Sequence, residues 1–170
     1  MNFTREDVLR AGEQGHLRLR DMLSDDLSQV LAIENNAHVS PWSRLSFEES
    51  LTREHHCRVI DASDSPGAAP KIVGYHVVCG VVDELHILNI VTATQFQGIG
   101  LGHMLMSDIL DVAKQENLAK LFLEVRSSNR VAQSLYLKWQ FEQIALRKGY
   151  YRPTSPDGAR EDAFVLMRQL

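Results

Sequence analysis

The segment Gln97–Gly98–Ile99–Gly100–Leu101–Gly102–His103 places three glycines within five residues, between two regular apolar patterns. Residues 84–92 before it predict a strand, and residues 101–115 after it have apolar side chains at helical spacing. A glycine-rich turn at the start of a helix presents unpaired backbone N–H groups that bind anions. The segment therefore predicts a site for a phosphate or diphosphate, with a tight turn that binds nothing as the alternative.

Two common nucleotide motifs do not fit this loop. A P-loop requires GxxxxGK[ST], which the chain lacks. The dinucleotide fingerprint GxGxxG would need a third glycine where His103 stands. The spacing that remains is Gln97-x-x-Gly100-x-Gly102.

The pattern along the rest of the chain predicts an α/β fold. Strands are expected at residues 16–22, 57–60, 72–82, 84–92, 120–125, 141–146 and 163–167. Helices are expected at 24–36, capped by Ser24, from Ser43 onward, at 101–115 and at 129–139. This order favours a single mixed, mostly antiparallel sheet of about seven strands with about four helices.

Length and composition indicate one globular domain. The chain has 170 residues, of which 44% are hydrophobic and 24% charged. We expect one domain over residues 16–170, preceded by an extension of residues 1–15 whose order the sequence leaves open. The net charge of −4 argues against nucleic-acid binding.

The remaining composition predicts a cytoplasmic protein. No apolar run approaches the ~20 residues that span a bilayer, so no membrane partner is expected, and the amino end lacks the pattern of a secretory signal. Cys57 and Cys79 are expected to be buried, reduced thiols. The seven histidines show no metal-ligand spacing, so no metal is expected.

A second stretch, Leu123–Glu124–Val125–Arg126–Ser127–Ser128–Asn129, ends a predicted strand and enters a helix that carries Ala132, Leu135 and Tyr136. With the glycine loop, it resembles the GCN5-related N-acetyltransferase (GNAT) family, and more narrowly the RimI-type ribosomal protein N-terminal alanine acetyltransferases. The resemblance covers about residues 17–167. Four further stretches support it: Ala37–His38 with Pro41–Trp42–Ser43, Leu88–Asn89–Ile90–Val91, Tyr150–Tyr151, and Arg160–Glu161–Asp162–Ala163.

The resemblance implies a chemistry that explains these residue types. The chain would be an acyltransferase that moves the acetyl group of acetyl-CoA to the N-terminal alanine of small-subunit ribosomal protein eighteen, with an acceptor sequence beginning Ala-Arg-Tyr. Glu124 would be the base, since an α-amino group with pKa about 7.7–8.0 needs only a modest base. Tyr136 would be the acid that protonates the leaving thiolate. Without the resemblance, Glu124 reads as a solvated strand residue and Tyr136 as core.

The resemblance also implies the cofactor contacts. The backbone of Ile90, Val91 and Thr92 would pair with the pantetheine arm as an added strand does. The diphosphate would bind the loop residues Gly98, Ile99, Gly100, Leu101, Gly102 and His103. Asn129 would hydrogen-bond the cofactor through its side chain, or simply cap the helix that follows.

Two positions depart from the family pattern. Gly98 stands where the family usually has Arg or Lys, which removes one charged contact to phosphate. Gln140 stands where a glycine is expected, at a cost of roughly 1 kcal/mol if that residue needs positive φ. Tyr150 and Tyr151 are either core aromatics or part of an acceptor groove. Arg147, Lys148 and Arg152 are expected to form a solvated face.

Two other functions stay open at this point. A related acetyltransferase could act on another peptide or on a small amine. A non-catalytic module could bind coenzyme A or a protein partner, but it would have no chemical need for both Glu124 and Tyr136.

Overall fold

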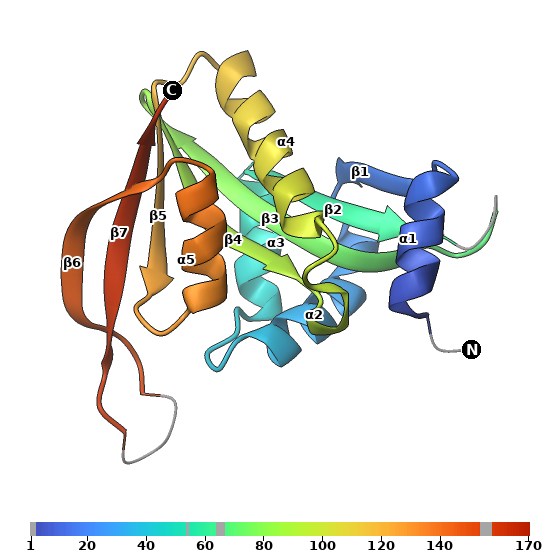
Figure 1. Ribbon diagram of the computed structural model, residues 1–170, viewed down its shortest axis with the longest axis horizontal. Helices are drawn as coiled ribbons and strands as arrows, with labels where there is room; N and C mark the ends of the chain where they lie inside the picture. Colours follow the sequence, from blue (N-terminus) through green and yellow to red (C-terminus); the bar gives the residue numbers. More distant parts are fainter. Residues whose placement is uncertain (1–2, 54, 64–66, 154–157) are drawn as a thin grey trace. The chain divides into compact units, whose positions relative to one another are not determined.

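A computed structural model describes residues 3–53, 55–63, 67–153 and 158–170 (Figure 1). Within these residues the chain forms seven strands in the hydrogen-bonded order β1-β2-β3-β4-β5-β7-β6. The strands are β1 (Leu17–Asp21), β2 (His56–Ala62), β3 (Lys71–Val81), β4 (Glu84–Thr92), β5 (Lys120–Arg126), β6 (Glu142–Tyr151) and β7 (Glu161–Gln169). The helices are α1 (Arg5–Glu13), α2 (Leu27–Ala37), α3 (Arg44–Thr52), α4 (Leu101–Gln115) and α5 (Arg130–Lys138), with short 3₁₀ turns η1 (Ser24–Asp26) and η2 (Thr94–Phe96).

The strand directions confirm the predicted fold class. β4 and β5 pair in parallel, whereas β1 pairs with β2, β5 with β7 and β6 with β7 in antiparallel fashion. The chain forms two compact units, residues 1–77 with 89–105 (unit 1) and residues 78–88 with 106–170 (unit 2). Strands β3 and β4 and helix α4 contribute residues to both units.

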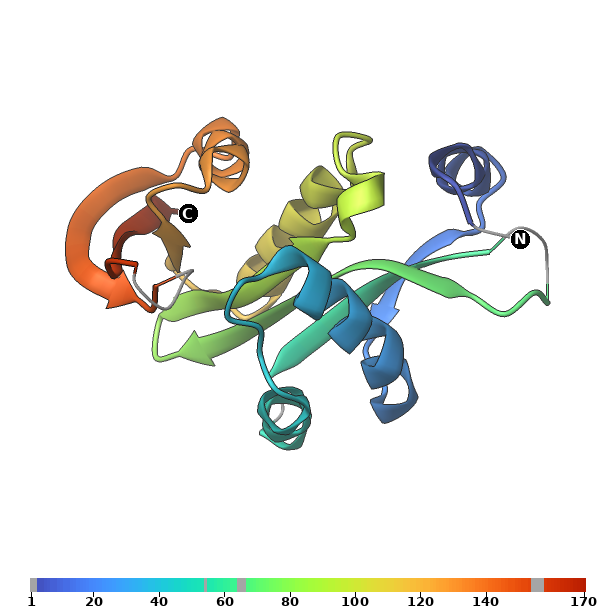
Figure 2. The ribbon, with the colours of Figure 1, turned by 90° about the horizontal axis from the view of Figure 1, so that it is seen from below.

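Unit 1 is built around strands with helices on both faces. Figure 2 shows α2 and α3 on one face of its strands, with α1 and the segment 94–100 on the other. Each helix buries its apolar positions, among them Val8 of α1, Leu27 of α2 and Phe47 of α3. Phe96 and Leu105, on either side of the glycine loop, belong to the same core. The loop is therefore anchored at both ends by packed side chains.

An ion cluster joins the first elements of unit 1. Arg20 donates through Nη1 and Nη2 to both carboxylate oxygens of Asp26, at 2.6 and 2.8 Å, and through Nε to Asp61 at 2.6 Å. Asp26 also accepts from the backbone N–H of Leu23 at 2.8 Å. Burial raises the pKa of Asp26, but the hydrogen bonds from Arg20 and Leu23 outweigh it and hold that pKa below its usual value.

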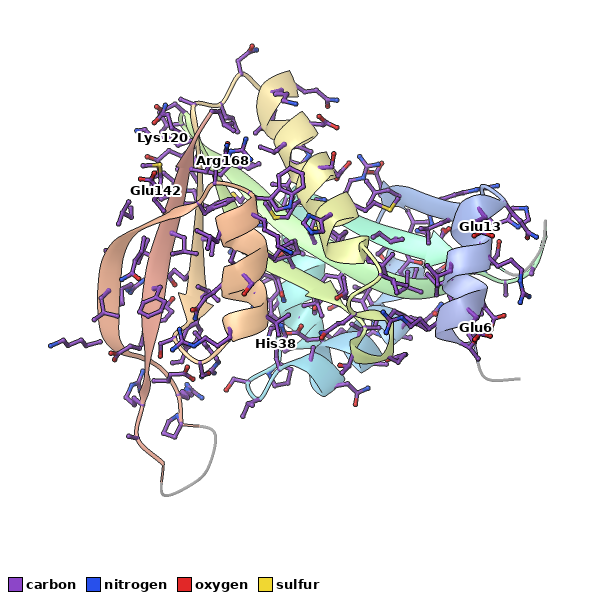
Figure 3. All side chains as sticks on the ribbon, in the orientation of Figure 1. Glu6, Glu13, His38, Lys120, Glu142 and Arg168 are labelled. Atoms are coloured by element: carbon purple, nitrogen blue, oxygen red, sulfur yellow. The ribbon has the colours of Figure 1, made fainter. Side chains whose placement is uncertain are left out.

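Unit 2 contains the antiparallel strands β5, β7 and β6 together with α5. β5 pairs with β7 from Lys120↔Gln169 to Arg126↔Ala163, and β6 pairs with β7 from Glu142↔Met167 to Tyr151↔Glu161. Lys120, Glu142 and Arg168 mark the same end of these three strands in Figure 3. The opposite end carries Glu124 and the tyrosines of β6. Each strand therefore brings a different part of the sequence to one end of this unit.

Most predicted elements are confirmed, and the differences have local causes. Ser43 caps α3 as expected, with its hydroxyl accepting from the N–H of Ser46 at 3.2 Å. The prediction that Ser24 caps a helix was wrong, because residues 24–26 form a separate 3₁₀ turn whose carboxylate Asp26 binds the Leu23 N–H. Helix α1 lies within the extension whose order the sequence left open. The sequence prediction for β6 stopped at residue 146, five residues short.

Three expectations about composition can be compared with the described residues. Both cysteines are free thiols, Cys57 buried and Cys79 half-buried rather than fully buried as expected. Among the described residues, no three His, Cys, Asp or Glu side chains are grouped so as to hold a metal ion. None of the helices in the described part of the chain is long and apolar enough to cross a membrane. The predicted loop at 62–70 and the one at 152–160 lie partly outside the described residues.

Candidate active site

The glycine loop in unit 1 has the backbone that its sequence predicts. Gly98 and Gly100 have φ of +79° and +96°, in the left-handed region that favours glycine. Helix α4 begins at Leu101, so Gly102 and His103 lie in its first turn. The N–H of His103 already donates to the carbonyl of Gly100 at 2.9 Å, so the donors left for a ligand come from the residues before it. The loop can therefore present backbone donors to an anion.

Strand β4 leads directly into this loop. Val91 is buried, and Ile90 and Thr92 are half-buried. The backbone N–H of Ala93 donates to the carbonyl of Val73 at 2.9 Å, which fixes the end of the strand against β3. Ile90, Val91 and Thr92 thus share unit 1 with the six loop residues predicted to bind the cofactor.

Glu124 lies near the end of β5 in unit 2, where it forms an ion pair with Arg147 of β6. The two residues are not paired directly, because Glu124 is opposite Val165 and Arg147 is opposite Ala163, both on β7. Paired residues of neighbouring strands face the same side of a sheet, and Ala163 and Val165 are two residues apart on β7, so Glu124 and Arg147 lie on the same face. The Glu124 side chain is 28% exposed and Arg147 is 51% exposed. The expectation that Arg147 belongs to a solvated face missed this ion pair.

The two tyrosines at the end of β6 surround Glu124. The neighbouring Glu124 carboxylate raises the pKa of the Tyr150 phenol, and the Arg147 guanidinium lies 3.9 Å from the centre of the Tyr150 ring. Burial, followed by the charge of Glu124, raises the pKa of Tyr151 to about 12. Tyr150 is 37% exposed, so the core interpretation was wrong for this ring. Glu124, Arg147 and the two phenols form one cluster of polar groups that remains open to solvent.

The segment Arg160–Glu161–Asp162 holds this cluster in place. Asp162 accepts from the backbone N–H of Gly149 at 2.8 Å, and Arg160 donates to the carbonyls of Gly149 and Tyr150. Glu161 accepts from Arg126 at 2.9 Å and from the N–H of Ser128 at 2.8 Å. These contacts give a structural reason for a stretch that the sequence identified only by resemblance.

Tyr136 is the buried residue of helix α5. Its side chain is 6% exposed, and its ring lies 5.7 Å from that of Phe141 in a tilted contact. Burial, with a smaller effect of Tyr151, raises the pKa of the Tyr136 phenol above its ordinary value. No hydrogen bond of its hydroxyl to another described residue is present. A protonated phenol that has no partner in the described part of the chain can donate to a ligand.

Asn129 caps helix α5. Its side-chain Oδ1 accepts from the backbone N–H of Ala132 at 3.1 Å, which is the alternative that the sequence left open. Asn129 is exposed, and among the described residues its Nδ2 donates to none, so it can donate to a ligand. Gln133, one turn further, donates to the carbonyls of Arg126 and Ser127 at 2.9 and 3.0 Å and fixes α5 to the end of β5.

A buried carboxylate in unit 1 was not predicted. Glu34 of α2 is 1% exposed and accepts from the backbone N–H of Trp42 at 2.7 Å, the Tyr75 hydroxyl, and Asn89 at 3.4 Å. The imidazole of His38, labelled in Figure 3, lies 3.5 Å from the same carboxylate. His38, Trp42 and Asn89 all come from stretches quoted for the resemblance. The available signal was a charged residue within the apolar stripe of α2.

The predicted site residues thus fall into two groups. Unit 1 holds the strand end 90–92 and the loop 98–103, and unit 2 holds Glu124, Asn129 and Tyr136. A cavity of about 500 Å³ in unit 1, bounded by α2, Lys71, Ile72 and the segment 93–96, is lined by none of them. The sequence missed Arg147 and Glu34, which act through contacts between residues far apart in the chain.

Comparison with known families identifies the class. A model of the Acetyltransferase (GNAT) family matches residues 20–141, and the chain belongs to this family. The expected enzyme class, an acyltransferase of the GNAT family, is confirmed at the level of family membership.

Similar proteins narrow the comparison. The chain is 33% identical over 141 residues to the [ribosomal protein bS18]-alanine N-acetyltransferase of Escherichia coli strain K12, covering 83% of this chain and 89% of that protein. It is 31% identical to the enzyme of that name in Haemophilus influenzae, over 83% and 90% of the two chains.

Solved structures agree with the fold. The crystal structure of the ribosomal-protein-S18-alanine N-acetyltransferase from Escherichia coli matches with a TM-score of 0.77 and 29% identity, over 90% and 93% of the two chains. Ard1 from Thermoplasma volcanium matches with a TM-score of 0.76 at 21% identity, over 91% and 98%, which supports the fold alone.

Proposed function

We propose that this protein transfers the acetyl group of acetyl-CoA to the α-amino group of an N-terminal alanine, and that its acceptor is ribosomal protein bS18. The observation that carries the proposal is the match of more than four-fifths of the chain to relatives with this name, at 31–33% identity. The residues that the resemblance assigns to catalysis and cofactor binding are present at every position except Gly98.

The cofactor would be held mainly by backbone groups. The loop from Gly98 to His103 offers N–H donors and a helix start to the diphosphate. The backbone of Ile90, Val91 and Thr92 would pair with the amides of the pantetheine arm, which otherwise lose hydrogen bonds to water. Asn129 would donate through Nδ2, because its Oδ1 is used for the helix cap.

Glu124 would act as the base. The acceptor arrives largely as an ammonium, and its proton passes to Glu124, directly or through a water molecule. The neutral nitrogen then attacks the thioester carbonyl to give a tetrahedral intermediate. Arg147 already pairs with the Glu124 carboxylate and fixes its position relative to β6.

Tyr136 would act as the acid. Collapse of the intermediate forms the amide and breaks the C–S bond; the nitrogen releases its second proton to solvent, and the leaving thiolate takes the phenolic proton of Tyr136. A phenol is protonated at neutral pH even at its ordinary pKa, and burial raises the pKa of Tyr136 further, so the proton is present when the thiolate forms. The proton that Glu124 received returns to the tyrosine through solvent and completes the cycle.

Thiol release from acetyl-CoA tests the proposal directly. A hexapeptide beginning Ala-Arg-Tyr should give release, and the same peptide with a blocked amino terminus should give none. Release with small amines but not with the free peptide would favour the related acetyltransferase. Acetyl-CoA binding without release in any of these assays would favour the non-catalytic module.

A further inference from the structure

The glycine loop has an arginine beside it that comes from another part of the sequence. A β-carbon placed on Gly98 would lie 3.4 Å from Nη2 of Arg5, the first residue of α1. We propose that Arg5 binds the diphosphate of coenzyme A and supplies the positive charge that the loop itself lacks. The inference rests on the proposed function, in which this loop holds the cofactor, and it gives a role to the segment before residue 16.

Three contacts fix the start of α1 near the loop. Thr4 caps the helix, with its hydroxyl accepting from the Asp7 N–H at 3.3 Å while Asp7 accepts from the Thr4 N–H at 2.8 Å. The ring of Phe3 lies 6.1 Å from that of Phe96, edge to face, just before Gln97. One turn further, Val8 is buried in the core of unit 1. The backbone of Arg5 is therefore held on both sides of the residue.

The guanidinium of Arg5 is available for an anion. Among the described residues, it forms neither an ion pair nor a hydrogen bond, and its side chain is exposed. The nearest acid along the helix, Asp7, is used by the Thr4 cap and by Arg10 at 3.6 Å. Glu6, labelled in Figure 3, is the other acid in the first turn of α1. A planar guanidinium with two parallel donors matches the geometry of phosphate oxygens.

The absence of a side chain at Gly98 leaves room for the guanidinium of Arg5. The φ of +79° at Gly98 strains any residue with a side chain, and a side chain there would reach the Arg5 guanidinium. A cation carried by residue 98 would need a different loop backbone. In this chain the loop keeps its left-handed glycine, and the charge comes from α1.

Binding measurements on matched variants test the inference. Arg5→Ala and Arg10→Ala each remove one exposed positive charge from α1, and alanine favours the helix in both. Dissociation constants would be measured calorimetrically for CoA and 3′-dephospho-CoA, and by competition for pantetheine, which has no diphosphate. Arg5→Ala should weaken both nucleotides by about three- to tenfold, as expected for a partly exposed charge-assisted contact, and leave pantetheine unchanged. Arg10→Ala should bind all three as the unmodified protein does.

The outcomes separate this inference from the proposed function. Equal CoA affinity in Arg5→Ala and Arg10→Ala overturns the role of Arg5 and leaves the proposed function standing. A loss for CoA but not for 3′-dephospho-CoA also overturns it, because the contact would then be to the 3′-phosphate. An equal loss of affinity for pantetheine overturns it as well, because pantetheine has no diphosphate and the substitution would then have disturbed the loop. Failure of the unmodified protein to bind CoA overturns both proposals.

Discussion

Replacing Tyr136 with phenylalanine removes one oxygen atom and keeps the ring. The ring is 6% exposed and packs against Phe141, and phenylalanine preserves that contact. The hydroxyl has no hydrogen-bond partner among the described residues, so its removal breaks none of their hydrogen bonds. We therefore expect the free energy of unfolding to change by less than about 0.5 kcal/mol.

The effect on catalysis should be large. If the phenol protonates the leaving thiolate, its loss removes general acid catalysis and should lower kcat about 10²- to 10⁴-fold, which is about 2.7–5.4 kcal/mol in the activation barrier. The dissociation constant of acetyl-CoA should not change, because the proposed cofactor contacts lie elsewhere. The assay is thiol release with the free Ala-Arg-Tyr peptide, beside CoA titration and thermal unfolding of the same preparation.

Tyr75→Phe provides the matched control. Tyr75 is also buried, but its hydroxyl donates to the Glu34 carboxylate, so its removal leaves that carboxylate with one donor fewer. We expect this variant to lose about 1–2 kcal/mol of stability. A Tyr136→Phe enzyme that keeps kcat within threefold would refute the assignment of Tyr136 as the acid. If Tyr136→Phe loses as much stability as Tyr75→Phe, the inference that the Tyr136 hydroxyl has no hydrogen-bond partner among the described residues is refuted.

Three further variants test other parts of the structure. Glu124→Gln should lower kcat/KM about 10²- to 10³-fold at pH 7 and recover partly above pH 8, where the acceptor amine arrives neutral; a pH-independent loss would exclude the base role. Gln140→Gly should raise stability by about 1 kcal/mol, because Gln140 has φ +61° after the end of α5; an unchanged Tm would show that this backbone carries no strain. Asp26→Asn should cost about 2 kcal/mol near pH 7, or about 6 °C in Tm, since Asp26 pairs with Arg20 in a largely buried site. Because folding lowers the pKa of Asp26, the stability that this carboxylate contributes is complete above the unfolded pKa near 4 and is lost as pH falls further. The difference in the free energy of unfolding between Asp26→Asn and the unmodified protein should therefore narrow below about pH 4 in denaturant titrations. A difference that stays constant with pH would contradict the ion-pair origin.

The sequence predicted the bounds of those helices and strands that have a clear periodic pattern of apolar residues. Helix α4 has a clear apolar stripe, and its predicted bounds of 101–115 agree with the structure. Strand β6 lacks such a pattern, because its first seven residues are exposed, and the sequence prediction ended five residues early. Helix α1 buries only Val8 and Ala11, which is too little periodicity to predict a helix from nine polar-rich residues.

The sequence predicted only those residues of the candidate site that lie within continuous motifs. Glu124, Tyr136 and the glycine loop lie in continuous stretches, and the resemblance named them, although their roles remain predictions. Arg147 reaches Glu124 across β7, and this contact depends on the register of three strands. The approach of Arg5 to Gly98 likewise depends on the packing of Phe3 against Phe96. Such contacts are set by tertiary structure, and no local pattern encodes them.

Acids withdrawn from solvent hold the segments that carry the family motifs in both units: Glu34 is buried and Asp162 is half-buried. In unit 1, Glu34 binds the backbone of Trp42 and the side chain of Asn89; in unit 2, Asp162 binds the backbone of Gly149 beside the two tyrosines. An apolar residue at position 34 would continue the stripe of α2 and avoid the cost of burying a charge, which is several kcal/mol unless hydrogen bonds offset it. A carboxylate can accept several N–H and O–H donors at once, and an apolar side chain can accept none. These acids therefore fix the position of loop backbone at some cost in stability, which is the arrangement expected where the geometry of a reaction depends on loops.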